Sequence, residues 1–560
     1  MKTGEAWLRS VSLRVVSCVL LLCGILLAGC FGDEDPSAVS DGPPAPPTPV
    51  PSAPPAPQAV PVPEPLPWHP NDGLSDLEIT TIASADGHAV PVSIYKPQIA
   101  SNETQVPIIL QSHGFTGSKA TAPNAFLDYV AAGFGVVSFD QRGHGEATDT
   151  SSVGFMQPDL EVQDAIAIID EISTWDWVLM ENETTRDPVL GTIGYSYGGA
   201  FQLMTSIFDD RIDAMVPEIT WHNITTALAP NGAIKSGWVD LFYVAGNTIS
   251  PITFSEDFHR GFAWATATNE LPAGQAPEVP DLVTEFNEAS PQNYDQPPIP
   301  TLLVQGMTDT LFPLNQAVDN YDALTAAGAD VFLYSHLAGH VLNSESLAPG
   351  NSPVPVGLQG VPGGRPCGEQ KALDIAWHQK HLLGLDVPLG PRVCIALEDG
   401  TAVVGDRFPL PSTQMTDVSL AGPYPVVQAV GGTTIPIEVF AADEETVMAG
   451  IPTLSGSITS PGADAIVYWS FQMLRADGVM EHIVDDQVRP LRISGPNTGA
   501  IEFDMDLGGI GTRLQSGDTL YLVLSSIEPV FFGNSGRVPA GLVVEDLELR
   551  LPVITQPTFA

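Results

Sequence analysis

The chain carries very little positive charge for its size. Its 560 residues include 21 lysines and arginines against 66 aspartates and glutamates, which gives a formal net charge of −45 at pH 7. A surface this negative repels polyanions, so binding to nucleic acid is excluded. Two interpretations of the imbalance stay open: a saline habitat, where salt screens the self-repulsion, or an acidic secreted protein without a salt requirement. Lysine is especially scarce and occurs at positions 2, 96, 119, 235, 371 and 380.

Cysteine is scarce too, with five residues in the whole chain. Cys18 and Cys23 lie in an N-terminal apolar run, and Cys30 follows the end of that run. This leaves Cys367 and Cys394 for the body of the protein. In an oxidising compartment these two cysteines could pair, which would clamp a helix expected at 367–383 to the segment that leaves its domain.

The first 29 residues have the pattern of a lipoprotein signal peptide. Basic residues precede an apolar run from Val15 to Ala28, which is too short for a typical membrane-spanning helix. The run ends in Leu27-Ala28-Gly29-Cys30, which resembles a lipobox whose Cys30 becomes the lipidated first residue of the mature chain. An uncleaved N-terminal anchor is the alternative. Both interpretations predict an extracytoplasmic protein that is attached to the cell membrane at its N-terminus.

Composition divides the rest of the chain into three parts. Residues 30–72 are dense in proline, alanine and valine and are predicted to form a disordered, extended tether, because they cannot bury enough apolar surface to fold. Residues 73–398 alternate between strand and helix patterns and predict an α/β domain. Residues 399–560 contain short alternating strands with glycine, proline and aspartate turns, which predict an all-β sandwich, a jelly roll. No metal-ligand or nucleophile pattern appears in this last part.

One stretch of the α/β part, Val189–Gly199, predicts a nucleophile elbow. An apolar run with the length and β-branching of a buried strand leads into Gly194-Tyr195-Ser196-Tyr197-Gly198. Strand, Gly-x-Ser-x-Gly and helix together present a serine at a tight turn, with its Oγ at a helix N-terminus. Ser196 is therefore the predicted nucleophile, and a glycine-rich packing turn is the alternative. The helix is indicated by apolar residues with one-faced helical spacing, namely Ala200, Leu203, Met204, Ile207 and Phe208.

The strands before the elbow lead to a predicted oxyanion loop. Asp86-Gly87 indicates a hairpin between two alternating strands. The next strand, Val106–Leu110, runs into His113-Gly114-Phe115. In α/β-hydrolases one oxyanion donor comes from this loop and the other from the residue after the nucleophile. The backbone N–H groups of Phe115 and Tyr197 are thus the expected donors, and His113 is interpreted as a structural residue that orients the loop.

Two further loops supply the predicted partners of Ser196. Asp309 follows the penultimate predicted strand, where α/β-hydrolases carry the acid of the triad, and a turn or helix-capping aspartate is the alternative. His340 lies in the loop after the last predicted strand, Val331–Tyr334. It is preferred as the base over His336, which lies two residues past that strand. The order Ser196, Asp309, His340 is the order of α/β-hydrolases.

Residues 221–297 interrupt the strand pattern and predict a helical cap over the active site. The segment contains aromatic helical pieces and no strand rhythm. Its aromatic residues could line a substrate pocket, or they could pack the core of the cap, and both uses stay open. The residues concerned are Trp221, Trp238, Phe242, Tyr243 and Trp264.

The whole arrangement resembles the X-Pro dipeptidyl-peptidase and cocaine-esterase superfamily of serine hydrolases, over about residues 75 to 555. The resemblance implies an α/β-hydrolase domain with a helical cap, a C-terminal jelly-roll domain, and acyl transfer to water without a metal or an organic cofactor. Esterases of this group often place a tyrosine side chain in the oxyanion loop, whereas the loop around Phe115 supplies none. The segments that carry the resemblance are 194–199, the cap, 306–309, 339–340, 447–452, 467–469 and 475–478.

Two hypotheses from different classes follow. The first is a surface-anchored serine hydrolase that cleaves peptide or related acyl bonds like an X-Pro dipeptidyl-peptidase, with a carboxylic-ester hydrolase of the same fold as the alternative. The second is a catalytically silent binding lipoprotein that keeps the fold. A dipeptidyl-peptidase must fix the α-ammonium group of its substrate, which requires carboxylates close to Ser196. The acidic residues available in the cap are Asp240, Glu256, Asp257, Glu270, Glu278, Asp281, Glu285, Glu288 and Asp295.

Overall fold

The computed structural model describes residues 73, 75–182, 184, 186–248, 252–340, 365–428, 432–461, 464–483, 487–494, 499–531 and 540–560. These residues belong to one structural unit, Pro67–Ala560. The predicted signal peptide, the lipidation site Cys30 and the tether at 30–72 lie outside the described residues. No helix in the described part of the chain is long and apolar enough to cross a membrane.

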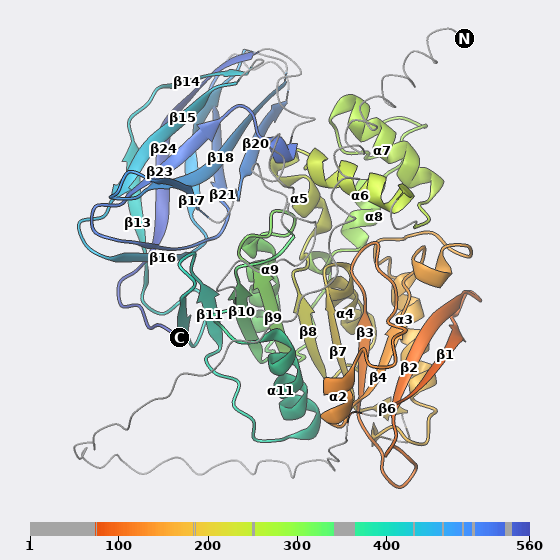
Figure 1. Cartoon of the computed structure of the whole chain (residues 1–560). Helices are drawn as coiled ribbons and strands as arrows, with labels where there is room; N and C mark the ends of the chain where they lie inside the picture. Colours follow the sequence, from red (N-terminus) through yellow and green to blue (C-terminus); the bar gives the residue numbers. More distant parts are fainter. Residues whose placement is uncertain are drawn as a thin grey trace, which may run out of the picture. The chain divides into compact units, whose positions relative to one another are not determined.

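A mixed sheet of ten strands, counted over the described residues, forms the centre of the α/β part (Figure 1). Its order is β1-β2-β4-β3-β7-β8-β9-β10-β11-β12. The antiparallel hairpin of β1 and β2 is the one that Asp86-Gly87 predicts, and the strands from β4 to β11 run parallel. The bounds are β1 Ser75–Ala83, β2 Ala89–Pro97, β3 Ile108–Ser112, β4 Gly135–Phe139, β7 Leu190–Tyr195, β8 Ala214–Glu218, β9 Thr301–Gly306, β10 Val331–His336, β11 Val393–Ala396 and β12 Ala402–Gly405.

The sheet extends beyond the end that the sequence predicts for it. The sequence analysis placed the last strand at Val331–Tyr334 and the end of the domain at residue 398. In the structure β11 pairs parallel with β10, and β12 pairs antiparallel with β11. Each of these strands has four residues. In strands this short the alternation of apolar and polar residues does not distinguish them from the β-rich segment that follows.

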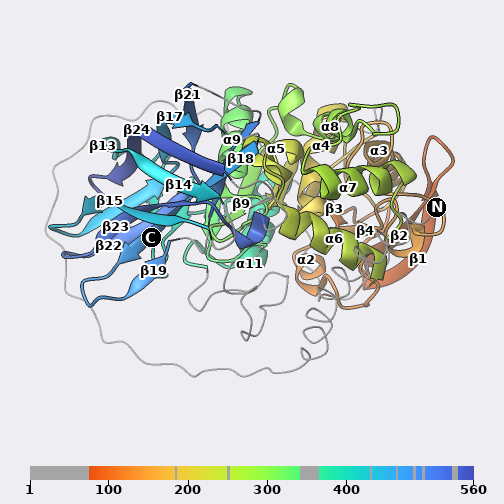
Figure 2. The ribbon, with the colours of Figure 1, turned by 90° about the horizontal axis from the view of Figure 1, so that it is seen from above.

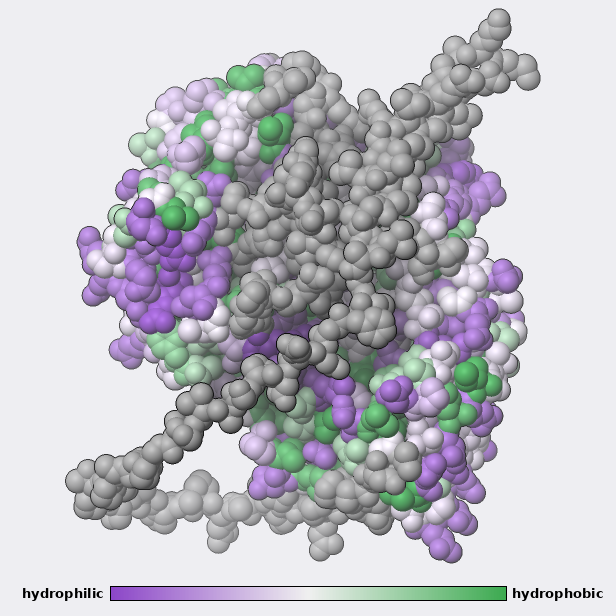
Figure 3. Space-filling view, viewed as in Figure 1, coloured by the Kyte–Doolittle hydropathy of each residue, from purple (hydrophilic) through white to green (hydrophobic). Residues whose placement is uncertain are grey.

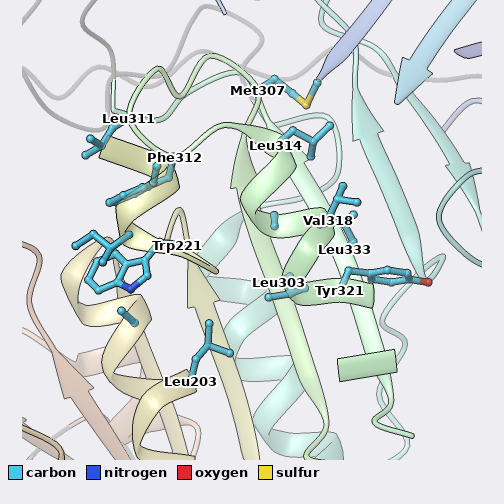
Figure 4. Close-up of a cluster of buried hydrophobic side chains, with 14 of the residues drawn as sticks. Leu203, Trp221, Leu303, Met307, Leu311, Phe312, Leu314, Val318, Tyr321 and Leu333 are labelled. Atoms are coloured by element: carbon cyan, nitrogen blue, oxygen red, sulfur yellow. The ribbon is translucent and has the colours of Figure 1, made fainter. Parts of the chain in front are cut away.

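Helices cover both faces of this sheet. Successive strand residues point to opposite sides, so that Ile109 belongs to one core cluster and Leu110 to the other. Helices α3, α4 and α9 pack in the cluster that contains Leu110, part of which is seen in Figure 4, and α2 and α11 pack in the other. The bounds are α2 Leu127–Ala131, α3 Glu161–Ile172, α4 Tyr197–Phe208, α9 Leu314–Ala326 and α11 Gln370–Leu383. The short strands β5 Met180–Asn182 and β6 Asp187–Pro188 pair with each other outside the main sheet.

The predicted cap is helical and lies in the chain between β8 and β9. In Figure 2 its helices are the yellow-green ribbons labelled α5 to α8. Three of them, α5, α7 and α8, have a side chain at the N-cap position that is typical of helix starts. The side chains of Asn223, Ser255 and Asp281 accept hydrogen bonds from backbone N–H groups in the first turns of these helices. The bounds are α5 Ile224–Leu228, α6 Ser236–Thr248, α7 Glu256–Thr268 and α8 Leu282–Glu288.

The C-terminal part consists of two antiparallel sheets, drawn in cyan and blue in Figure 1. The first has the order β21-β17-β24-β16-β22, with β13 and β14 also pairing with β24, and the second has the order β15-β23-β18-β19, with β20 pairing with β18. The predicted fold class, an α/β domain with a helical cap followed by an all-β domain, is confirmed. The bounds are β13 Thr413–Leu420, β14 Tyr424–Gln428, β15 Thr434–Ala441, β16 Thr446–Gly450, β17 Thr453–Thr459, β18 Asp464–Leu474, β19 Met480–His482, β20 Arg489–Ser494, β21 Ile501–Asp506, β22 Ile510–Leu514, β23 Thr519–Ser525 and β24 Ala540–Ile554.

Hydrogen bonds join the β domain to both the α/β domain and the cap. Asn315 at the start of α9 donates from Nδ2 to the Leu507 carbonyl oxygen over 3.0 Å. Asn231 of the cap donates from Nδ2 to the Pro490 oxygen over 2.9 Å. The Arg492 guanidinium on β20 donates to the Gly232 oxygen over 3.3 Å and also to the Asn269 oxygen. The β domain therefore braces the cap at both ends of the segment that contains α6 and α7.

The predicted pair Cys367 and Cys394 forms a disulfide. It connects the start of the α11 region to β11, with the two Cα atoms 5.8 Å apart.

On the face of the molecule seen in Figure 3, hydrophilic residues gather at the left over the β domain, as expected for a chain with this excess of acidic residues. Elsewhere on that face hydrophilic and apolar residues are interspersed.

Candidate active site

Ser196 occupies a strained turn between β7 and α4. Its backbone has φ 57° and ψ −119°, in the left-handed half of φ space that residues with side chains rarely adopt. Its N–H donates to the Glu218 oxygen on β8 over 2.9 Å, which holds the turn at the end of the sheet. The flanking glycines are required by close packing: a Cβ on Gly194 would lie 2.4 Å from the Gly198 oxygen, and one on Gly198 would lie 2.4 Å from the Ser112 oxygen. This is the conformation of a nucleophile elbow.

Asp309 and His340 form a hydrogen-bonded pair on neighbouring loops. His340 Nδ1 lies 2.7 Å from Asp309 Oδ2. The other carboxylate oxygen of Asp309 accepts the N–H groups of Leu311 at 3.0 Å and Phe312 at 2.7 Å. Asp309 is fully buried. Both carboxylate oxygens are thereby hydrogen-bonded, which fixes the orientation of the carboxylate toward the imidazole.

The alternative histidine, His336, is engaged elsewhere. Its Nε2 lies 3.1 Å from Glu218 Oε1, and its Nδ1 accepts the N–H of Ala338 over 3.1 Å. The side chain is buried at the end of β10. With both ring nitrogens hydrogen-bonded to fixed partners, His336 has no nitrogen left for proton transfer to or from Ser196.

Ser196 lines a cavity, and the Asp309–His340 pair lies next to one residue of its wall. Ser196 and Phe312 both line it, and the His340 ring lies edge-on to Phe312 with centroids 5.3 Å apart. Ser196 Oγ makes no hydrogen bond to His340 among the described residues. In unliganded hydrolases this bond is often long and forms only in the complex with substrate.

The two predicted oxyanion donors face the same cavity. Phe115 and Tyr197 both line it, and their backbone N–H groups donate to no acceptor in the described part of the chain. His113 has the structural role that the sequence predicts. Its Nε2 accepts the Gln141 N–H over 3.1 Å, and its Nδ1 lies 2.8 Å from the Gly114 oxygen, so the ring is neutral and Nδ1 is the donor. Burial lowers the pKa of His113, in agreement with a neutral ring.

The cavity wall is apolar throughout. Measured by the positions open to the centre of a water molecule, its volume is about 90 Å³. None of its lining residues is charged, and its polar side chains are those of Ser196 and Tyr197. The Trp221 and Phe312 rings, with centroids 5.4 Å apart, lie next to each other in Figure 4. The lining residues are Phe115, Phe155, Ser196, Tyr197, Trp221, Ile224, Leu228, Ile234, Val239, Phe242, Phe258, Gly261, Phe262, Ala265, Leu271, Pro272, Leu282, Phe286, Leu311 and Phe312.

The five aromatic residues predicted for a substrate pocket divide into two groups. Trp221 and Phe242 line the cavity. Trp238, Tyr243 and Trp264 are not among the residues that line it, which agrees with the alternative use of these aromatic residues in packing. Trp238 instead donates from Nε1 to Thr310 Oγ1 over 3.1 Å and packs against His340, and Tyr243 stacks on Phe262 inside the cap. Their positions depend on how the cap helices pack against each other, which a helical period alone does not give.

Phe155 in the cavity wall and Glu161 behind it lie outside the cap and are not predicted from the sequence. Phe155, in the loop before α3, stacks on Phe115 with centroids 5.9 Å apart and on Phe258 at 5.0 Å. Glu161, the first residue of α3, is buried beside Tyr197. In the sequence Glu161 cannot be told apart from the acidic residues that commonly occupy the first turn of a helix, so its burial is not predicted.

The fold and this site define the class of the protein, an α/β-hydrolase with a serine at the nucleophile elbow. The family model "X-Pro dipeptidyl-peptidase (S15 family)" matches residues 86–341, which contain the elbow, the cap and the Asp309–His340 pair. The superfamily resemblance is thereby confirmed. A curated relative, an uncharacterized 31.7 kDa protein of Escherichia coli, is 27% identical over 116 residues, which are 20% of this chain and 37% of the relative. The chain thus spans little more than a third of that relative's length.

Solved structures share the fold of both domains. A CocE/NonD family hydrolase from Staphylococcus aureus matches with a TM-score of 0.61 and 13% identity, over 86% of this chain and 93% of the other. An aminopeptidase from a marine sediment Thaumarchaeota archaeon gives 0.63 and 14%, over 86% and 97%. An α-amino acid ester hydrolase gives 0.61 and 16%, over 86% and 97%. The fold of these three chains is therefore similar to that of most of this chain.

Proposed function

We propose that the chain hydrolyses esters or amides whose acyl part is bulky, apolar and uncharged, through a triad of Ser196, His340 and Asp309. The observation that carries this proposal is the cavity beside Ser196, whose wall contains no charged side chain. Moving a charged group from water into a cavity with such a wall costs free energy unless the charge is paired. Each CH₂ of an apolar acyl group that is buried there instead contributes about 0.8 kcal/mol to the free energy of binding.

The proposed reaction proceeds through an acyl-enzyme. Ser196 Oγ attacks the carbonyl carbon while His340 takes the hydroxyl proton, and the backbone N–H groups of Phe115 and Tyr197 stabilise the oxyanion. The C–O or C–N bond then breaks, and the imidazolium gives its proton to the leaving alcohol or amine. Water next attacks the acyl-enzyme with His340 as base, which releases the acid and restores Ser196. Asp309 holds the Nδ1–H tautomer of His340 and stabilises the imidazolium.

The cavity favours the esterase alternative over an X-Pro dipeptidyl-peptidase. A dipeptidyl-peptidase requires a carboxylate near Ser196 for the α-ammonium group of its substrate. None of the acidic cap residues considered for this role is among the residues that line the cavity. The match to the X-Pro dipeptidyl-peptidase family supports peptide cleavage as the second candidate, and an N-blocked peptide with an apolar acyl side would fit the same wall.

A panel of paired substrates tests the substrate class. We expect p-nitrophenyl esters of phenylacetic or butyric acid to be hydrolysed with a higher kcat/KM than the corresponding glycine ester, because the ammonium group of glycine finds no counter-ion in the cavity. X-Pro anilides with free and acetylated amino termini form the second arm. Strong preference for the free amino terminus would overturn the proposal in favour of a dipeptidyl-peptidase.

Attachment to a membrane through a lipid on Cys30 is the second part of the proposal. It rests on the basic start, the apolar run and the lipobox-like Leu27-Ala28-Gly29-Cys30. We expect a Cys30→Ser chain, expressed in a bacterium that processes lipoproteins, to lose lipid labelling and to leave the membrane fraction. Unchanged retention of the Cys30→Ser chain would contradict the lipid anchor and favour an uncleaved N-terminal helix.

A further inference from the structure

A buried carboxylate lies behind the wall of the cavity. Glu161, at the start of α3, is 2% exposed. Its Oε1 accepts the Gly154 N–H over 2.5 Å, and its Oε2 accepts the Gln157 N–H over 3.2 Å. One carboxylate thus holds both ends of the four-residue turn 154–157. The mechanism above does not use Glu161.

The turn that Glu161 holds has an unfavourable backbone. Phe155 has φ 58° and Met156 has φ 69°, so two successive residues with side chains lie in the left-handed region. Such a conformation is unfavourable for a residue with a side chain and persists only where its surroundings enforce it. The two hydrogen bonds of Glu161 are the polar contacts that close the turn on either side of this pair.

The strained turn directs the Phe155 ring into the cavity wall. The ring stacks on Phe115, which carries one expected oxyanion donor, and on Phe258 of the cap with centroids 5.0 Å apart, and it meets Phe286 of the cap edge to face at 5.2 Å. Without the turn, a residue at position 155 in an ordinary extended or helical conformation would send its side chain elsewhere. Phe155 is thus the point where a loop of the α/β domain closes the cavity against the cap.

Glu161 also contacts the other oxyanion residue. The Tyr197 hydroxyl donates to Glu161 Oε1 over 3.3 Å, and Oε1 is the same atom that accepts the Gly154 N–H of the turn. The side chain of the residue that follows the nucleophile is therefore tied to the same turn. Glu161, Tyr197 and the turn form one hydrogen-bonded unit behind the wall.

We propose that Glu161 is a positioning residue that determines acyl-group specificity, because its carboxylate holds the 154–157 turn so that the Phe155 ring shapes the wall of the acyl cavity. The proposal rests on the proposed function of this cavity. It implies that the wall is formed when the carboxylate is ionised, since the anion is the stronger acceptor for the Gly154 and Gln157 N–H groups.

The titration of Glu161 falls in a range where enzymes are assayed. Burial is the largest influence on its pKa; the backbone N–H bonds and Arg142 lower the pKa, Asp164 raises it, and the net result is a pKa raised to about 7. Tyr197, packed against it, stays protonated because burial raises the pKa of the phenol well above its usual value. The carboxylate is therefore charged above about pH 7 and protonated below it, so selectivity for bulky acyl groups rises with pH.

The test compares two esters in one set of assays, p-nitrophenyl phenylacetate and p-nitrophenyl acetate. The ratio of their kcat/KM values cancels any effect of pH that is common to the two esters. In the wild type we expect this ratio to rise between pH 6 and pH 8. In Glu161→Gln, which keeps the size of the side chain but cannot accept both N–H groups as an anion, we expect KM for the phenylacetate to rise about tenfold, with little change for the acetate and a ratio that no longer depends on pH.

The matched control is Glu171→Gln on the same helix. Glu171 is exposed and accepts the Trp175 Nε1–H over 3.3 Å, so its change removes a charge from α3 without touching the turn. We expect this variant to keep the wild-type ratio and its pH dependence. Phe155→Leu provides a second route if Glu161→Gln does not fold, and it should also lower the ratio.

The possible failures are distinguishable. Hydrolysis of neither ester by the wild type would overturn the proposed function, and the role of Glu161 with it. Hydrolysis of both esters with the same ratio and pH profile in wild type, Glu161→Gln and Phe155→Leu would overturn the role of Glu161 alone.

Discussion

A Ser196→Ala chain is expected to lose roughly five to six orders of magnitude in kcat on p-nitrophenyl phenylacetate, because removal of the nucleophile leaves only the oxyanion donors and binding. The variant should fold normally. Serine already has a Cβ in this turn, so alanine removes the hydroxyl oxygen and adds no atom. Circular dichroism and thermal unfolding would verify this. Initial-rate assays at enzyme concentrations high enough to detect residual turnover would measure the loss.

Labelling with a fluorophosphonate separates this expectation from a catalytically silent protein. The wild type should be labelled at Ser196, which peptide mass spectrometry can locate, and Ser196→Ala should not be labelled. A folded wild type that neither reacts with the probe nor hydrolyses any ester of the panel would favour a binding lipoprotein that keeps the fold.

The second large effect is expected at the proposed base. His340→Ala should cost about as much as Ser196→Ala, and Asp309→Asn somewhat less, roughly four orders of magnitude, because the asparagine supports the wrong imidazole tautomer. Both losses should appear in kcat more than in KM. They would be measured with the same ester under conditions where each variant remains folded.

His336→Ala is the control for this assignment. The His336 ring is hydrogen-bonded to Glu218 and Ala338, so removing the ring should reduce thermal stability. Turnover should stay within about an order of magnitude of the wild type. If His336→Ala abolishes turnover while His340→Ala retains it, the assignment of the base is wrong.

The fold could be predicted from the sequence wherever local pattern and topology agree. The strand before Ser196 and the helix after it carry different hydrophobic periods, and a glycine-flanked serine stands between them. The same local logic predicted the β1–β2 hairpin from Asp86-Gly87. The places of Asp309 and His340 follow from chain order, because the ends of successive parallel strands meet at one edge of a sheet.

The wall of the cavity could not be predicted in the same way. Phe155 reaches it through two left-handed residues, and Glu161 enforces that conformation from the next helix. Neither interaction leaves a period in the sequence. The exclusion of Trp238 and Tyr243 from the cavity likewise depends on tertiary packing, of Trp238 against the α/β domain and of Tyr243 within the cap. These features are set by tertiary packing rather than by local propensity.

The attachment of the cap to β20 has a consequence for how substrate fit can evolve. Arg492 holds the cap through the Gly232 and Asn269 carbonyl oxygens, and its own orientation is fixed by bonds to Asp464 on β18. Asn231 is bound to Pro490 on the same strand. Selection for a new acyl group can therefore act on residues of the jelly roll, more than two hundred positions downstream of Ser196 in the chain. Substitutions in the β domain could therefore change which acyl groups the protein accepts, while the residues of the proposed triad stay the same.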